Sequence, residues 1–144
     1  MIPTSVLQWK STAEKYAAIH PVLRPNEILA IIWSESSGNP KAINESDPSY
    51  GLMQITIAIG RKFSMRVTTP ADLMDPDTNI EAGSGFLAHL KSAYAESYPL
   101  TDPNCAWVAA YNEGEPNLWH KRPDPNYISA FVSHLAELNS GGNA

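Results

Sequence analysis

Apolar residues recur at helical spacing along most of this sequence. Positions three and four apart lie on the same side of an α-helix, so a stretch with this spacing buries one face. The spacing predicts helices over residues 4–19, 26–37, 78–97, 103–111 and 126–139. Helix-breaking residues follow several of these stretches, among them Pro21, Gly38 and Gly114. The sequence therefore predicts a mainly α-helical fold.

Shorter segments connect these helices. Residues 57–64 and 69–74 are predicted as short helices, the second begun by Thr69 with Pro70 at its first position. Thr78 and Glu81 form a predicted capping box at the start of the 78–97 helix. The segments 41–49 and 113–125 are predicted as loops, and residues 50–56 fit either a strand or a helical turn. Trp119, in the second loop, either stacks on a ligand or covers the core.

Length and composition narrow the class of protein. The 144 residues fit one domain, residues 1–144, and no apolar run approaches the roughly 18 residues that span a membrane. The N-terminus lacks the basic and apolar regions of a signal peptide. A net charge of -5 provides no basic surface for nucleic acid, and the single Cys105 cannot form an internal disulfide. We expect a monomer with a buried thiol, no integral membrane segment and no nucleic-acid partner.

A glutamate near the end of the 26–37 helix is the candidate catalytic residue. Glu35 shares a helical face with Ile28, Ile31 and Ile32, which places its carboxyl on the apolar side. Burial and the negative end of the helix dipole both favour the protonated carboxyl. We therefore predict a raised pKa, which a general acid needs near neutral pH. The alternative is an ordinary solvated glutamate at a frayed helix end.

Further motifs follow Glu35 in a fixed order. Ser36 comes next, then a polar loop, then Gly-Leu-Met-Gln-Ile at residues 51–55, and far downstream Ala-Tyr-Asn at residues 110–112. From about residue 25 to the last helix, this order resembles the catalytic domain of the soluble lytic transglycosylases, which cleave the glycan strands of peptidoglycan. Several short motifs in order are more specific than any one of them. The resemblance implies an all-α, lysozyme-like single domain with at most a minimal β segment.

The same resemblance implies a set of substrate-binding residues. The Gln54 amide offers both a donor and an acceptor to a sugar. The tyrosine of the Ala-Tyr-Asn motif lies near the catalytic glutamate in the family, although packing alone would equally explain a buried Tyr111. Many members have a serine where this chain has Asn44, and the loop before Gly51 is one residue longer here. The implied substrate-binding residues are Asn44, Tyr50, Gln54, Tyr111 and Asn112. Asn79 and Gly83 match the family's central helix and are expected to be structural, with the glycine permitting close packing.

The resemblance also implies a mechanism with one glutamate, where most glycosidases use two carboxyl groups. Glu35 would protonate the leaving oxygen while the substrate's N-acetyl group supports the positive sugar. The ionised glutamate would then take a proton from the 6-hydroxyl, which attacks to give a 1,6-anhydro end. No metal or cofactor is expected, because the four histidines and one cysteine show no ligand spacing.

Two other functions remain open at this stage. One is a peptidoglycan hydrolase similar to goose-type lysozyme, in which Glu45 or Asp47 acts as a second acid. The other is a non-catalytic wall-binding protein or phage structural component. A catalytic domain without a signal peptide fits a phage lysis enzyme, or endolysin, that reaches the cell wall through membrane holes, or a domain of a longer protein.

Overall fold

The computed structural model describes residues 1–94, 105–114 and 124–141. Within these ranges it contains seven α-helices, one 3₁₀ helix and one two-stranded antiparallel hairpin. The α-helices are α1 (Thr4–Leu7), α2 (Lys10–Ile19), α3 (Pro25–Ser36), α4 (Ile57–Phe63), α5 (Pro76–Tyr94), α6 (Ala106–Glu113) and α7 (Pro125–Gly141). The remaining elements are η1 (Pro70–Met74), β1 (Ile43–Asn44) and β2 (Ser49–Tyr50). The predicted mainly helical fold with a minimal β segment is confirmed.

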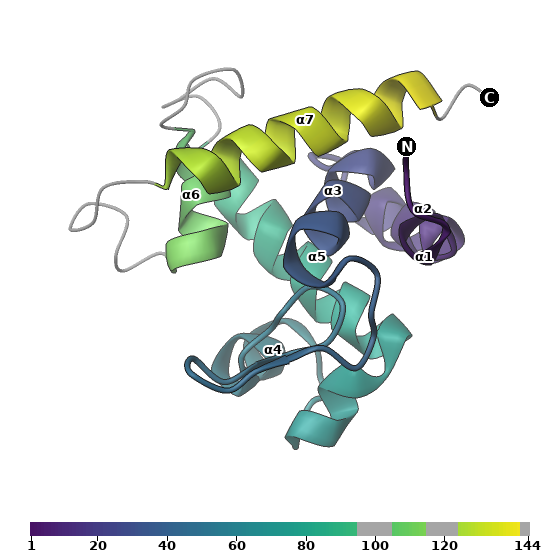
Figure 1. Ribbon diagram of the computed structural model, residues 1–144. Coiled ribbons are helices and arrows are strands. Elements are labelled where there is room, and N and C mark those ends of the chain that lie inside the picture. The colour runs from purple at the N-terminus through teal and green to yellow at the C-terminus, as the bar shows by residue number, and fades with distance from the viewer. Residues whose placement is uncertain (95–104, 115–123, 142–144) are drawn as a thin grey trace.

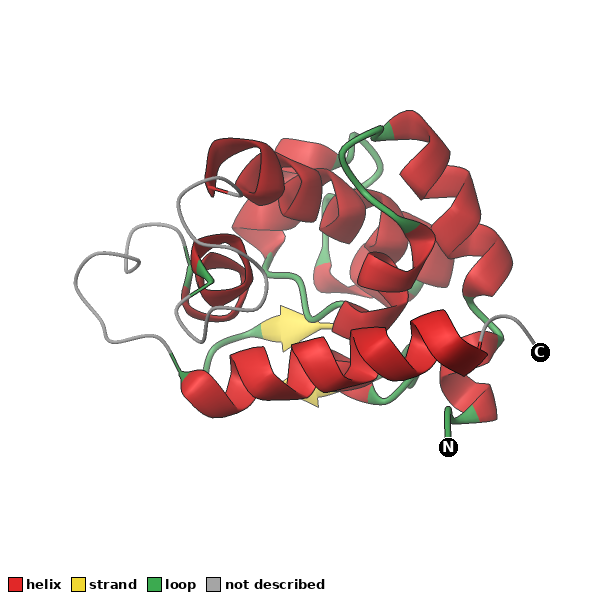
Figure 2. Cartoon of the chain, turned by 90° about the horizontal axis from the view of Figure 1, so that it is seen from above, coloured by secondary structure: helices red, strands yellow, loops and turns green. Residues whose placement is uncertain are grey.

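Helix α5 is central to the arrangement, because it contacts α2, α3, α4, α6 and η1. Helix α7 crosses α3 and also contacts α6 (Figure 1). The hairpin and α4 lie on the side of α3 away from α7 (Figure 1). The view from above shows α1 and the end of α7 at the same end of the molecule (Figure 2). There the amino group of Met1 pairs with Glu137 at 2.6 Å.

The helix predicted over residues 4–19 is in fact two helices. The chain turns at Gln8 and Trp9, between α1 and α2. The indole nitrogen of Trp9 donates to the carbonyl of Gly38 at 3.1 Å, and Ser5 Oγ donates to the carbonyl of Ser37 at 2.8 Å. The break thus lets α1 pack against the end of α3.

The start of α5 differs from the prediction. The helix begins at Pro76, and Asp75 caps it by accepting hydrogen bonds from the backbone and hydroxyl of Thr78 at 3.0 and 2.9 Å. Glu81 does not complete a capping box with Thr78. Its carboxylate instead accepts from Ser64 and from Arg66, the latter at 3.2 Å. The predicted helix over 78–97 is otherwise confirmed to Tyr94, and residues 95–97 lie outside the described ranges.

The other predicted helices agree with the structure to within a few residues, whereas the segment 41–49, predicted as a loop, contains β1 and the start of β2. Residues 70–74 form a 3₁₀ helix after Thr69, and residues 125–141 form the last helix. Helix α6 ends before Gly114 as predicted, but its predicted start at Pro103 lies outside the described residues. Residues 50–56 contribute a strand end, a turn and a bridge between Tyr50 and Ile55. Trp119 also lies outside the described residues.

The hydrophobic core surrounds α3, of which residues 27–32 are all buried. Glu27 is among them, and its carboxylate accepts from Lys91 at 2.7 Å. Cys105 is buried, as predicted. A β-carbon at Gly83 would collide with the side chain of Met53, which confirms that this glycine permits close packing. Across the described ranges, no helix is long and apolar enough to cross a lipid bilayer.

Candidate active site

Glu35 lies in the last turn of α3, where the helix is tied to the turn that follows the hairpin. The hydroxyl of the next residue, Ser36, donates to the carbonyl of Leu52 at 2.7 Å. A helix end leaves backbone groups without intrahelical partners, so its orientation depends on such contacts. Ser36 therefore fixes the end of α3 that carries the Glu35 carboxyl.

The buried side-chain amide of Asn79 fixes the turn at residues 51–54 through hydrogen bonds. Asn79 on α5 accepts from the backbone nitrogen of Met53 at 2.8 Å and donates to the carbonyls of Tyr50 and Leu73 at 2.8 and 2.9 Å. Gly51 has a φ of +78°, and a β-carbon there would collide with Asn79 and with the Leu73 carbonyl. Only glycine fits this backbone without strain. The expected structural role of Asn79 is confirmed.

Gln54 reaches the cleft, but its hydrogen-bonding groups hold the cleft wall together. Its amide nitrogen donates to the carbonyls of Ala42 and Gly51 at 3.1 and 2.9 Å, and its oxygen accepts from Ser49 Oγ at 3.1 Å. Its backbone has a positive φ of 52°. In this structure Gln54 shapes the wall. Its direct contact with a sugar stays a prediction.

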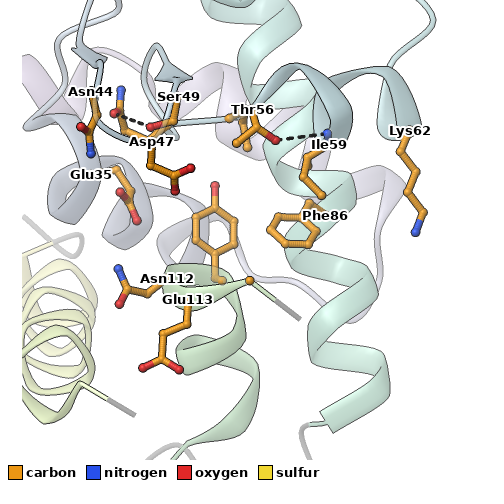
Figure 3. Close-up of a pocket in the computed structure, with 14 residues that line it drawn as sticks. Glu35, Asn44, Asp47, Ser49, Thr56, Ile59, Lys62, Phe86, Asn112 and Glu113 are labelled. Carbon is orange, nitrogen blue, oxygen red and sulfur yellow. Dashed lines mark hydrogen bonds between the residues drawn. The ribbon is translucent and has the colours of Figure 1, made fainter. Parts of the chain in front are cut away.

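A cleft of about 370 Å³ opens beside Glu35. Figure 3 shows it between the hairpin, α4, α5 and the end of α6. Its volume is within the range of small-ligand sites. The residues that line it are Glu35, Asn44, Asp47, Ser49, Gln54, Ile55, Thr56, Ile59, Lys62, Phe86, Tyr111, Asn112, Glu113 and Gly114.

The Glu35 carboxyl has the properties of a general acid. Burial raises its pKa from the usual 4.5 to about 7, and this is the largest effect on it. A hydrogen bond from Tyr127 acts in the opposite direction and lowers the pKa by stabilising the carboxylate. The two effects leave a group that is close to half protonated near neutral pH. The predicted rise in the pKa of Glu35 is confirmed.

Tyr127 is a candidate site residue that the sequence pattern did not predict. It lies in the first turn of α7, and its hydroxyl donates to Glu35 Oε2 at 2.5 Å. The partners are 92 residues apart in sequence, so no local pattern relates them. The available signal was the spacing of Tyr127 from Phe131, which places the ring on the buried side of the helix. That signal indicates packing and does not identify the partner of the hydroxyl.

Tyr111 lines the cleft, and its hydroxyl bonds to the protein backbone. The hydroxyl donates to the carbonyl of Met53 at 2.7 Å. Burial, and to a smaller extent the charge of Glu35, raise the pKa of this phenol. Its ring also packs against Phe86 at a centroid distance of 5.2 Å. Tyr111 is therefore both a core residue and a neighbour of the Glu35 carboxyl.

The structure places the other predicted substrate-binding residues in two groups. Asn44 and Asn112 are exposed in the cleft wall (Figure 3). The oxygen of Asn44 accepts from the hydroxyl of Ser46 at 2.8 Å, which leaves its amide nitrogen for other partners. Tyr50 does not line the cleft but packs against the core. Its contact with substrate stays a prediction.

Two further carboxyl groups line the cleft. Asp47 is exposed, and Figure 3 shows its carboxylate turned into the cleft, whereas that of Glu113 points away from Glu35. Glu45, the other candidate for a second acid, does not line the cleft. Within the described part of the chain, no group of three or more histidine, cysteine, aspartate or glutamate side chains is arranged to bind a metal.

Known proteins with related sequences show which family this chain belongs to. Residues 12–126 match the family described as "Transglycosylase SLT domain". The chain is 39% identical over 94 residues to membrane-bound lytic murein transglycosylase C of Pectobacterium atrosepticum, covering 60% of this chain and 26% of that protein. It is 36% identical over 117 residues to endo-type membrane-bound lytic murein transglycosylase A of Salmonella paratyphi B, covering 75% of this chain and 56% of that protein. The chain thus spans about a quarter to a half of these relatives.

Solved structures show the same fold. An inactive mutant of the lytic transglycosylase Slt from Pseudomonas aeruginosa superposes with a TM-score of 0.75 at 22% identity, covering 93% of this chain and 24% of that one. The 70 kDa soluble lytic transglycosylase of Escherichia coli gives a TM-score of 0.64 at 21% identity, with 93% and 22% coverage. The lysozyme-like fold is confirmed, and the family match covers every cleft-lining residue. The chain therefore belongs to the transglycosylase SLT domain family.

Proposed function

We propose that this chain cleaves the β-1,4 bond between N-acetylmuramic acid and N-acetylglucosamine in peptidoglycan, without water, leaving 1,6-anhydro-muramoyl ends. The observation that carries the proposal is Glu35: a carboxyl with a pKa of about 7, in a cleft, bonded to Tyr127. Membership of the SLT domain family and the names of the curated relatives support the same activity.

The first step uses the protonated form of Glu35. A carboxyl group with this pKa is substantially protonated near neutral pH, so it can give its proton to the glycosidic oxygen as the bond breaks. Positive charge then develops on the muramoyl sugar. In this proposal the substrate's own N-acetyl group supports that charge, as the resemblance to lytic transglycosylases implies.

The second step uses the ionised form. Once Glu35 has lost its proton, the Tyr127 hydroxyl stabilises the carboxylate through the 2.5 Å hydrogen bond. The carboxylate takes the proton of the 6-hydroxyl, whose oxygen bonds to the anomeric carbon. Glu35 is thereby protonated again, and no water is consumed.

The competing outcome is hydrolysis. A second carboxylate in the cleft could activate water, and Asp47 and Glu113 line the cleft beside Glu35. Asp47 is exposed at the end of the hairpin. The proposal therefore rests on proximity: a well-placed internal hydroxyl reaches effective molarities of about 10⁵ M or more, far above that of water.

Mass spectrometry of the products tests this proposal. Purified peptidoglycan sacculi are digested with the wild-type protein and with Glu35→Gln, which keeps the shape of the side chain. The wild type should release muropeptides one water lighter than hydrolysis products, without new reducing ends, and the variant should release essentially none. Accumulation of reducing ends would identify a hydrolase, and the release of neither product would identify a non-catalytic protein.

The biological setting stays a prediction. We propose that the chain acts on the cell wall, and a phage lysis enzyme is one such setting. The curated relatives are bacterial and are named as membrane-bound, which favours a bacterial wall enzyme as the second setting. Two assays would separate these settings. One is lysis of cells by protein added from outside, and the other is lysis from within by the chain expressed with and without a holin. The predicted monomeric state can be checked by light scattering.

A further inference from the structure

The charges around the cleft are unevenly distributed. The carboxyl groups that line it are those of Glu35, Asp47 and Glu113, whereas Lys62 is the one cationic residue among the described residues that line it. Figure 3 shows Lys62 on α4 at the opposite end from Glu35, with Ile59 and Phe86 between them. The cleft thus has an acidic end and a basic end separated by an apolar stretch.

Lys62 has no carboxylate partner in the described part of the chain. The ion pairs found there use Lys15, Arg66, Lys91 and the N-terminus instead. The Lys62 ammonium lies 5.7 Å from the centre of the Phe63 ring, and that ring packs against Phe86 at 5.9 Å. Lys62 is exposed to solvent and lines the cleft.

The chemistry of peptidoglycan indicates what this charge would meet. The sugars of the glycan strand are neutral, and the negative charges are the carboxylates of the lactyl-peptide arms on the muramoyl units. Asp47 repels such a carboxylate at one end of the cleft, and Lys62 attracts it at the other. We propose that Lys62 is a substrate-binding residue that receives a carboxylate of a peptide arm and so favours strands that carry charged arms. This inference rests on the proposed function, because it takes peptidoglycan as the substrate.

The expected contribution is modest. Lys62 is exposed, and ion pairs at exposed positions change an equilibrium by up to about fivefold. Lys62→Gln should raise KM for native strands about three- to fivefold, and Lys62→Glu about tenfold or more, with kcat unchanged in both. Lys62→Arg should keep the wild-type KM. The differences should shrink as salt is added, because salt screens exposed charges.

The test compares two substrates that differ only in charge. Soluble glycan strands with peptide arms are used as isolated, or after their carboxylates have been converted to amides with a carbodiimide and ammonia. Lys10→Gln and Lys10→Glu are matched controls, since Lys10 is an exposed lysine on α2 outside the cleft. The Lys62 variants should lose affinity for the native strands alone, and the Lys10 variants for neither substrate.

A binding measurement separates this inference from the proposed reaction. The same Lys62 changes are made in the Glu35→Gln background, and binding of fluorescently labelled strands is followed by anisotropy, which requires no turnover. Equal losses on native and amidated strands, or no loss on either, would overturn the assignment of Lys62. If Lys62 discriminates in binding while the active protein produces reducing ends, the proposed transglycosylase chemistry fails and the carboxylate site stands.

Discussion

Replacing Glu35 with glutamine should stabilise the protein, and the gain should grow with pH. Burial raises the pKa of Glu35 from the usual 4.5 to about 7, so the folded protein binds this proton more tightly than the unfolded chain does. As the pH rises from 4.5 towards 7, the unfolded chain ionises first. The free energy of unfolding therefore falls over this interval, and the loss is complete above the folded pKa.

The size of the effect follows from the two pKa values. One pKa unit corresponds to about 1.4 kcal/mol. The wild type should lose at most about 3 kcal/mol between about pH 4 and about pH 8 through this group. Glutamine has a similar shape, does not titrate and can still accept a hydrogen bond from Tyr127. The stability difference between variant and wild type should thus widen by about 2–3 kcal/mol, equivalent to roughly 5–10 °C in Tm.

Urea unfolding followed by circular dichroism measures this difference at a series of pH values. Glu14→Gln is the matched control, because it removes the same charge from an exposed position on α2. The folded Glu35→Gln protein should also lose wall-lysing activity by about two to four orders of magnitude. A stability difference that stays constant from acid to alkaline pH would refute the argument that Glu35 is buried with a raised pKa.

Three further predictions concern the tyrosines next to Glu35 and the two candidate second acids. Tyr127→Phe removes the hydrogen bond that lowers the pKa of Glu35, so the alkaline limb of the kcat–pH profile should move to higher pH; an unmoved limb would show that the hydroxyl does not act on the carboxyl. Tyr111→Phe leaves the buried carbonyl of Met53 without its hydrogen-bond donor. The free energy of unfolding should therefore fall by about 1–2 kcal/mol, and activity should fall with it. An unchanged urea midpoint would contradict this. Asp47→Asn and Glu45→Gln should each leave the rate of wall digestion nearly intact, whereas an inactive Asp47→Asn protein would make Asp47 a second catalytic carboxylate.

Local sequence determined most of the helices and the main catalytic candidate. The helical period of the apolar residues placed α3 within one residue of its observed ends and put Glu35 on the same side as the buried Ile28 and Ile31. Gly114 marked the end of α6. These features are predictable because helix formation and burial of a helix face depend on residues within a few positions of each other.

Where a side chain had more than one possible hydrogen-bond partner, the sequence did not show which partner it would take. Thr78 and Glu81 match a capping box, yet Asp75 caps α5 and Glu81 bonds to Ser64 and Arg66. Both arrangements satisfy the local pattern, and only the folded chain brings the distant donors close to Glu81. In the same way, the amide of Gln54 bonds to the carbonyls of Ala42 and Gly51, which flank the hairpin.

The tertiary structure alone determined the environment of the Glu35 carboxyl. Helical periodicity indicates that Glu35 faces the core, but the packing of α7 against α3 brings the hydroxyl of Tyr127 to within 2.5 Å of it. The folding of α4 and the hairpin around the same cavity places Asp47 and Lys62 at its two ends. Hydrogen bonds and charges act over a few ångströms in space, whatever the separation along the chain. The sequence therefore indicated Glu35 as the candidate acid, and the packing of distant helices set its pKa and its partners.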